Sequence, residues 1–205
     1  MRHYAKLLRA TLAASLMLVA VAGAAVAEPL EDASAALTRG DYATALRIFR
    51  ALADQGNVAA QDALGDMYEE GRGVRQDYAE ALKWFRLAAD QGFDDAQNDL
   101  GWMFHLGQGV AQNDAEALKW FRKSAEQGHA LAQYNLGVMY ERGAGALQDY
   151  VQAHMWYNLA AARFSASENE NRDSAVKARD FVASKMTSAQ IAEAQKLARE
   201  WKPER

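Results

Sequence analysis

Residues 77–112 read DYAEALKWFRLAADQGFDDAQNDLGWMFHLGQGVAQ, and residues 113–148 read NDAEALKWFRKSAEQGHALAQYNLGVMYERGAGALQ. The two stretches keep one register over 36 positions without an insertion or a deletion, and this register continues on both sides of them. The columns that extend over four copies are Asp41/Asp77/Asn113/Asp149, Ala45/Ala81/Ala117/Ala153 and Phe49/Phe85/Phe121/Tyr157. A fixed period between about 20 and 50 residues is typical of solenoids and propellers. The sequence therefore predicts an array of repeats.

Each copy carries the pattern of two helices joined by glycine turns. An acidic or amide residue followed three positions later by Glu or Gln, as in Asp77 and Glu80, is typical of a helix N-terminus with a capping box. Apolar residues then recur at three- and four-residue spacing, first up to Gly92 and again up to Gly107. Gly101 lies inside the second helix, where glycine is costly, and predicts a close backbone crossing with no room for a side chain.

The repeat pattern defines the predicted organisation of the chain, an all-α, α/α superhelical solenoid over residues 28–163. Its units are residues 41–76, 77–112, 113–148 and a partial copy at 149–163. We expect a short helix at 30–39 before the first unit. The glycine and leucine columns fail after residue 163, and residues 164–205 predict C-terminal helices that cap the open end of the array. Thr187 and Gln190 predict a capping box for the last of these helices.

Residues 1–27 have the order of a secretory signal peptide. Arg2, Lys6 and Arg9 precede a short apolar run, and Ala25 and Ala27 supply small residues before Glu28. The apolar run is short for a membrane span, so an uncleaved N-terminal anchor is the less favoured alternative. We therefore expect cleavage after Ala27, a periplasmic or secreted product, and no membrane insertion after cleavage.

Composition excludes several classes of function. The chain of 205 residues has a net charge of −4. The charged residues among 1–27 are all basic, so the exported product is more acidic than the full chain. An acidic chain lacks the electrostatic footprint of a nucleic-acid-binding protein or of a protein that adsorbs to anionic lipid. The absence of cysteine excludes disulfides, cysteine-ligated metals and a thiol nucleophile.

The repeat resembles the Sel1-like repeat. The resemblance lies in Ala-Gln-Asn-Asp-Leu-Gly-Trp-Met-Phe at 96–104, Gly-Gln-Gly-Val at 107–110 and Ala-Glu-Ala-Leu-Lys-Trp-Phe at 115–121, and it extends over residues 41–163. It implies a tetratricopeptide-like superhelix that serves as a protein-interaction scaffold. Exported bacterial members include regulators of sensor kinases and factors in exopolysaccharide production. Cysteine-rich members have been linked to penicillin binding, but this chain lacks their cysteines.

A serine and a lysine in the C-terminal segment match the nucleophile motif of penicillin-recognising enzymes. Ser174 and Lys177 have the Ser-x-x-Lys spacing, but neither Ser-Asp-Asn nor Lys-Thr-Gly accompanies them. The pair also falls in a predicted capping helix, which favours a structural interpretation. A hydrolase of a cell-wall or β-lactam amide is therefore an alternative that the sequence disfavours.

Other residues with catalytic or metal-binding chemistry form no recognisable constellation. The Gly-x-Gly turns lack the preceding strand and the third glycine of a phosphate-binding fingerprint. The histidines, which stand singly and without zinc-site spacing, are His3, His105, His129 and His154. Adjacent carboxylates such as Glu69-Glu70 and Asp94-Asp95 point in different directions on a helix. The sequence therefore predicts no catalytic residue, no metal and no cofactor.

A set of helical positions outside the apolar stripe varies from copy to copy, so the core does not dictate it. By analogy with other helical repeats, the helix that carries these positions lines the concave side. The predicted partner-binding residues are Asp62, Asp66, Glu69, Asn98, Trp102, His105, Tyr134, Val138 and Glu141. Ordinary solvated helix surface is the alternative. A further column, Ile48/Trp84/Trp120/Trp156, permits a binding stripe or packing between repeats, and its regular spacing favours packing.

Together these patterns predict a non-catalytic protein-interaction scaffold or adaptor in the bacterial cell envelope. The resemblance implies a regulatory role in signalling or exopolysaccharide production. A purely structural component of envelope assembly is the second non-catalytic alternative. The expected partner is a protein, and its identity is left open.

Overall fold

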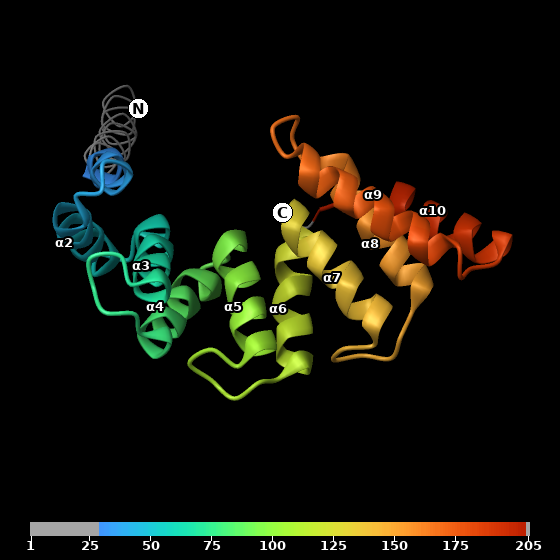
Figure 1. Ribbon diagram of the computed structural model, residues 1–205, viewed down its shortest axis with the longest axis horizontal. Coiled ribbons are helices and arrows are strands. Elements are labelled where there is room, and N and C mark those ends of the chain that lie inside the picture. The colour runs from blue at the N-terminus through green and yellow to red at the C-terminus, as the bar shows by residue number, and fades with distance from the viewer. Residues whose placement is uncertain (1–28, 204–205) are drawn as a thin grey trace, which may run out of the picture.

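The structure is a computed structural model that describes residues 29–203, in which every regular element is a helix. The helices are α2 (Tyr42–Ala53), α3 (Val58–Glu70), α4 (Tyr78–Asp90), α5 (Asp94–Leu106), α6 (Asp114–Gln127), α7 (Ala130–Arg142), α8 (Tyr150–Arg163), α9 (Asn169–Ala183) and α10 (Ser188–Glu200). Residues 29–38 are helical too, as expected. The helices follow one another along the long axis (Figure 1), and the predicted all-α solenoid is confirmed. The predicted signal peptide lies outside the described residues.

Within residues 29–203 the helices fall short of the length and apolar character that a bilayer crossing requires. They pack instead as hairpins: α3 with α4, α5 with α6, and α7 with α8. A Gly-x-Gly turn lies inside each hairpin, and a shorter turn joins one hairpin to the next.

The start of the second helix in each hairpin follows the predicted cap only in part. The Asp77 carboxylate accepts from two backbone N–H groups of the first turn of α4, at 3.0 and 3.1 Å. The expected return bond from Glu80 is replaced, because the Asp77 N–H donates to the Tyr68 carbonyl at 2.9 Å. Glu80 instead accepts from Lys83 at 2.5 Å. The hydrogen bond from the Asp77 N–H to α3 therefore replaces the bond that the Glu80 side chain would accept in a capping box.

Two glycines set how closely the helices approach. Gly101 lies in α5, where a Cβ would sit 2.5 Å from the ring of Phe121 on α6. The position is closed, as predicted, but by a ring of the partner helix rather than by a crossing backbone. Gly109 has a φ of 67°, and a Cβ there would run into the backbone of Tyr78 in the preceding hairpin. The first contact fixes spacing within a hairpin, and the second fixes spacing between hairpins.

The recurring apolar columns form the core. The leucine column Leu64/Leu100/Leu136 is fully buried between the helices. In the tryptophan column, Trp120 and Trp156 are also buried, and Ile48 and Trp84 pack against a neighbouring apolar cluster. Packing between repeats, the interpretation that the regular spacing favoured, is therefore confirmed for this column.

A ladder of buried glutamines joins successive helices; it consists of Gln61, Gln97 and Gln133. The Gln97 amide donates to a carbonyl at the end of α4 at 3.2 Å, and its oxygen accepts from Gln127 on α6 at 2.8 Å. Gln61 makes the corresponding bonds one period earlier. The oxygen of Gln133 has no hydrogen-bond partner in the described part of the chain, since Arg163 occupies the position of the next glutamine. The ladder therefore ends where the repeats end.

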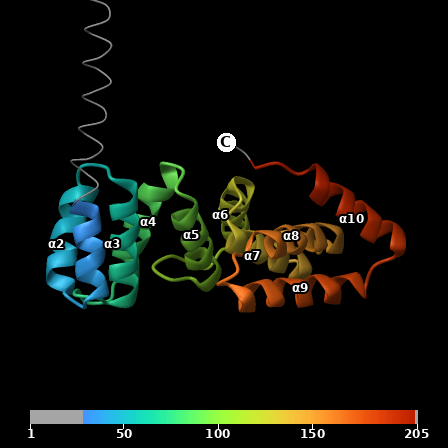
Figure 2. The same cartoon turned by 90° about the horizontal axis from the view of Figure 1, so that it is seen from above.

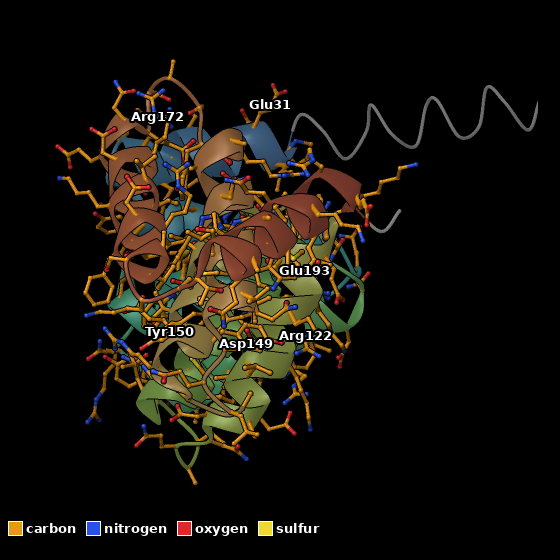
Figure 3. The ribbon with its side chains drawn as sticks, turned by 90° about the vertical axis from the view of Figure 1, so that its right-hand side faces the viewer. Glu31, Arg122, Asp149, Tyr150, Arg172 and Glu193 are labelled. Atoms are coloured by element: carbon orange, nitrogen blue, oxygen red, sulfur yellow. The ribbon has the colours of Figure 1, made fainter. Side chains whose placement is uncertain are left out.

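Helices α9 and α10 lie on opposite sides of α8 (Figure 2), and Figure 3 views the array from this end. On α9, Val182 is fully buried against α8. After α10, the Trp201 ring meets the Trp156 ring edge-on, with centroids 6.2 Å apart. The predicted capping box of α10 is present, because Thr187 and Gln190 bond each other's backbone N–H groups.

Candidate functional site

The predicted binding positions lie on α3, α5 and α7, and the structure brings four of them together. Trp102 and His105 of α5 and Tyr134 and Val138 of α7 line a hollow of about 200 Å³. We call it the aromatic hollow. Its lining is completed by Phe121, Asn135, Met139 and Arg142. Two consecutive repeats therefore contribute to one concavity.

The aromatic rings at this hollow pack against buried rings of the core. Trp102, with 37% of its surface exposed, meets the buried Phe121 ring edge-on, with centroids 5.7 Å apart. Tyr134 is half-buried and lies 5.4 Å from the ring of Tyr157, which is fully buried. These contacts limit the rotamers of both partly exposed rings before any partner binds.

His105 closes one side of the hollow in a fixed orientation. Its ring meets that of Trp102 at 5.7 Å, and its Nδ1 lies 2.7 Å from a carboxylate oxygen of Asp114 at the start of α6. The carboxylate holds the imidazole against α6, so His105 serves as a wall of the hollow and supports the Trp102 ring.

Two of the predicted binding residues are engaged inside the array. Asn98 was expected at the surface but is only 4% exposed; its oxygen accepts from Asn135 at 2.9 Å, and its amide donates to Asp99 at 3.2 Å. The expectation of a free side chain is wrong at this position, because α7 packs close enough to cover it. Glu141 accepts from the Tyr157 hydroxyl at 2.5 Å and is half-buried.

A second hollow, of about 400 Å³, lies between α7 and α9. Tyr134, Val138 and Arg142 line both hollows, which therefore adjoin. Sequence reasoning missed its outer wall, Phe181 of α9, which is 52% exposed. The sequence signal was present, since Phe181 lies off the buried stripe of α9 next to Val182.

The α3 end of the same face carries carboxylates: Asp62, Asp66 and Glu69 of α3 and Asp99 of α5. We call these four residues the carboxylate cluster. Burial, foremost, and neighbouring carboxylates raise the pKa of Asp62 to about 8, that of Asp66 to about 6 and that of Asp99 to about 7. Burial also raises the pKa of Glu69. Asp99 was not predicted, although its column varies between copies as the predicted ones do.

His129 and Asp95 form a bridge between repeats next to this cluster. The His129 Nε2 lies 2.9 Å from the Asp95 carboxylate, while its Nδ1 accepts from the Ala132 N–H at the start of α7. Burial, the largest single influence, opposes protonation of this ring, but the bond to Asp95 together with the neighbouring carboxylate charges outweighs it and raises the His129 pKa. The same bond lowers the Asp95 pKa. His129 is therefore a helix cap and a link between α5 and α7.

The other residues with catalytic or metal-binding side chains make contacts that stabilise the fold. Ser174 donates its hydroxyl to the carbonyl of Glu170 one turn earlier in α9, at 2.8 Å, which is the bond of a helical serine and not of a base-activated nucleophile. His154 is buried, and burial lowers its pKa. Among residues 29–203, no three His, Cys, Asp or Glu side chains are placed to hold a metal ion.

Comparisons with known proteins agree with the repeat. The Sel1 repeat family model matches residues 34–57, 58–93, 94–129 and 130–163. The last three of these matches correspond to the hairpins α3–α4, α5–α6 and α7–α8. Units that are counted from the capping residues begin at 41, 77 and 113. The starts of these three matches and of these units both repeat every 36 residues, but the family model places each boundary before the first helix of a hairpin and not before the second.

Two solved structures are similar to the chain over most of its length. A Sel1 repeat protein from Oxalobacter formigenes is 30% identical with a TM-score of 0.64, and the match covers 82% of this chain and 74% of that one. A protective antigen of uropathogenic Escherichia coli with an SLR fold is 29% identical with a TM-score of 0.56; the match covers 77% of this chain and 40% of the antigen. This chain thus spans less than half of the antigen. Curated protein sequences give no match. Because four consecutive repeat matches cover more than half of its residues, the chain belongs to the Sel1 repeat family.

Proposed function

We propose that the chain is a non-catalytic scaffold or adaptor of the bacterial cell envelope that binds a segment of a partner protein across α5 and α7. Sel1 repeat proteins generally mediate protein–protein interaction. The observation that supports this choice of surface is the aromatic hollow, where Trp102 and Tyr134 from consecutive repeats converge. Trp and Tyr are common anchors of interfaces, and rings that are already ordered lose less entropy on binding.

The envelope location rests on the pattern of residues 1–27. Mass spectrometry of the soluble envelope fraction should find a chain that begins at Glu28, because Ala25 and Ala27 provide the small residues that signal peptidase requires. A soluble envelope chain that begins at Met1 would contradict the proposed cleavage.

The proposed role is regulatory, in signalling or exopolysaccharide production, and its alternative is a purely structural part of an envelope assembly. Deletion of the gene distinguishes the two. A regulatory adaptor changes the expression of a defined set of genes, whereas a structural component changes only the integrity of an assembly.

Site-specific photo-crosslinking tests the surface directly. A photo-reactive residue in place of Val138 should give cross-linked adducts in intact cells, because Val138 lines the aromatic hollow. The matched control is Leu87, an exposed apolar residue on α4. Adducts at Val138 that disappear in the Trp102→Ala background support the proposal, and adducts confined to Leu87 place the interface elsewhere.

A further inference from the structure

We propose that the bound segment is cationic and apolar: one or more Lys or Arg side chains lie on the carboxylate cluster, and a neighbouring large apolar side chain fills the aromatic hollow. This inference rests on the proposed function and specifies its partner.

The cluster and the hollow are parts of one continuous surface. Asp66 and Trp102 occupy the same place in consecutive repeats, 36 residues apart. A chain of hydrogen bonds also joins the two regions, since Asp99 accepts from Asn98 and Asn98 accepts from Asn135, which lines the hollow. A segment that crosses α3, α5 and α7 therefore meets carboxylates first and aromatic rings next.

The charge at the cluster is poorly compensated from within the chain. Burial has the largest effect on Asp62, and the charged groups that act on it after burial are all carboxylates: Asp66, Asp99, Asp95 and Asp94. One oxygen of Asp62 is buried without a hydrogen-bond partner in the described residues. Burial and mutual repulsion disfavour the ionised forms of these carboxyls, and a partner cation would stabilise those forms.

The size of the hollow indicates a side chain of a peptide. Its volume of about 200 Å³ lies below the roughly 300–1,000 Å³ of typical small-molecule pockets. Trp102, Phe121 and Tyr134 give it apolar walls, which favour an aromatic or large aliphatic group by hydrophobic transfer. Anionic partners such as nucleic acid are disfavoured, because the adjoining carboxylates repel phosphate.

The far end of the surface fixes the direction of the segment. Arg142 lines both hollows, and Lys177 of α9 lines the second; Glu141 also lines the second hollow, where its carboxylate accepts from the Tyr157 hydroxyl, so the two cations outnumber it. These cations repel Lys or Arg, so the basic residues of the partner belong at the α3 end. Beyond the apolar side chain we expect a neutral or acidic residue near Arg142.

Selection of displayed random peptides on the immobilised protein tests the inference. We expect the selected sequences to be enriched in Lys or Arg close to Trp, Phe or Leu. A synthetic peptide of the consensus sequence, labelled for fluorescence anisotropy, should bind about tenfold more weakly to the double variant Asp66→Asn/Asp99→Asn and more weakly at high salt. Asp90→Asn, an exposed carboxylate on α4, is the matched control and should bind as the wild type does.

The possible results separate the two proposals. Selected peptides without basic residues, or equal affinity for Asp66→Asn/Asp99→Asn, overturn the cationic inference, while loss of binding in Trp102→Ala/Tyr134→Ala still supports the hollow as the site. Unchanged binding to Trp102→Ala/Tyr134→Ala overturns the proposed function at this surface as well. Thermal melts of each variant establish that it is folded.

Discussion

Within α3, α5 and α7, most residues on the side that faces the core are the same in every repeat, whereas those on the side that carries the site differ. Leu64, Leu100 and Leu136 recur at one position and are fully buried. Two residues further along, the same helices present Asp66, Trp102 and Val138. Packing against the next helix leaves room for only one type of residue, whereas the outer positions accept a carboxylate, an indole or an isopropyl group. The shared architecture thus leaves the chemistry of the site free to differ from repeat to repeat.

The largest effect on stability should come from placing a carboxylate, which the outer positions accept, at a buried leucine position. We expect Leu100→Asp to destabilise the fold by more than about 4 kcal/mol, because an unpaired carboxylate would be buried between repeats. Urea unfolding followed by circular dichroism measures this loss. Lys83→Ala is the control, since this exposed pair with Glu80 contributes little. Equal stability of the two variants would refute the assigned core.

A smaller loss should follow from filling a glycine position in the core-facing side. Gly101→Ala places a methyl group 2.5 Å from the Phe121 ring, and we expect a net loss of about 1–3 kcal/mol despite the better helix propensity of alanine. Thermal unfolding should show partial recovery in Gly101→Ala/Phe121→Leu. A gain in stability for Gly101→Ala would show that the ring moves aside without cost.

The carboxylate cluster should make stability depend on pH. A carboxyl group whose pKa is higher in the folded than in the unfolded chain retains its proton longer when folded, so its contribution is most favourable at low pH and is lost as pH rises through the folded pKa. An aspartate in the unfolded chain has a pKa of about 4. Burial and neighbouring carboxylates raise the pKa of Asp66 to about 6 and of Asp99 to about 7, so this loss falls between about pH 4 and pH 7.

The variant Asp99→Asn tests this dependence. It should raise the stability by about 1 kcal/mol at pH 8, roughly 2–4 °C in Tm, and change it little at pH 4, near the unfolded pKa of an aspartate. Arg72, Glu69, Glu70 and Asp95 also act on these carboxyls and remain in place in the variant. Equal stability of variant and wild type at both pH values would show that the Asp99 pKa is not raised in the folded chain.

The smallest effect on stability should come from the site residues themselves. Trp102→Ala and Tyr134→Ala should each change the free energy of unfolding by less than about 1.5 kcal/mol, because both rings are partly exposed, yet each should weaken partner binding by about 2 kcal/mol or more. Thermal melts and capture of the cross-linked partner measure the two quantities. Normal capture by both variants would move the site to the Gly-x-Gly turns or the C-terminal helices.

The sequence was sufficient for most of what recurs with the period, although the bond that replaces the return bond of the capping box and the ring that closes Gly101 were not predicted. Leu100, Gly101 and the cap at Asp77 follow from columns and local chemistry, and so do the helices. It was insufficient where the result depends on how one repeat approaches the next. The burial of Asn98 requires the position of α7, and the place of Phe181 beside Tyr134 requires the path of α9, which no column of the repeat determines. The raised pKa of Asp99 follows from the same approach of helices.

The glutamine ladder sets a rule for how such a chain can lengthen. Gln97 takes one bond from the helix before it and one from the helix after it, so each rung depends only on its immediate neighbours. Insertion of a whole 36-residue unit would supply its own rung and keep all others, whereas a shorter insertion would break the register. At Arg163 no glutamine follows, the oxygen of Gln133 has no hydrogen-bond partner among residues 29–203, and the ladder ends. Duplication in whole units therefore passes through folded intermediates at every step, which lets chains of different lengths share one architecture.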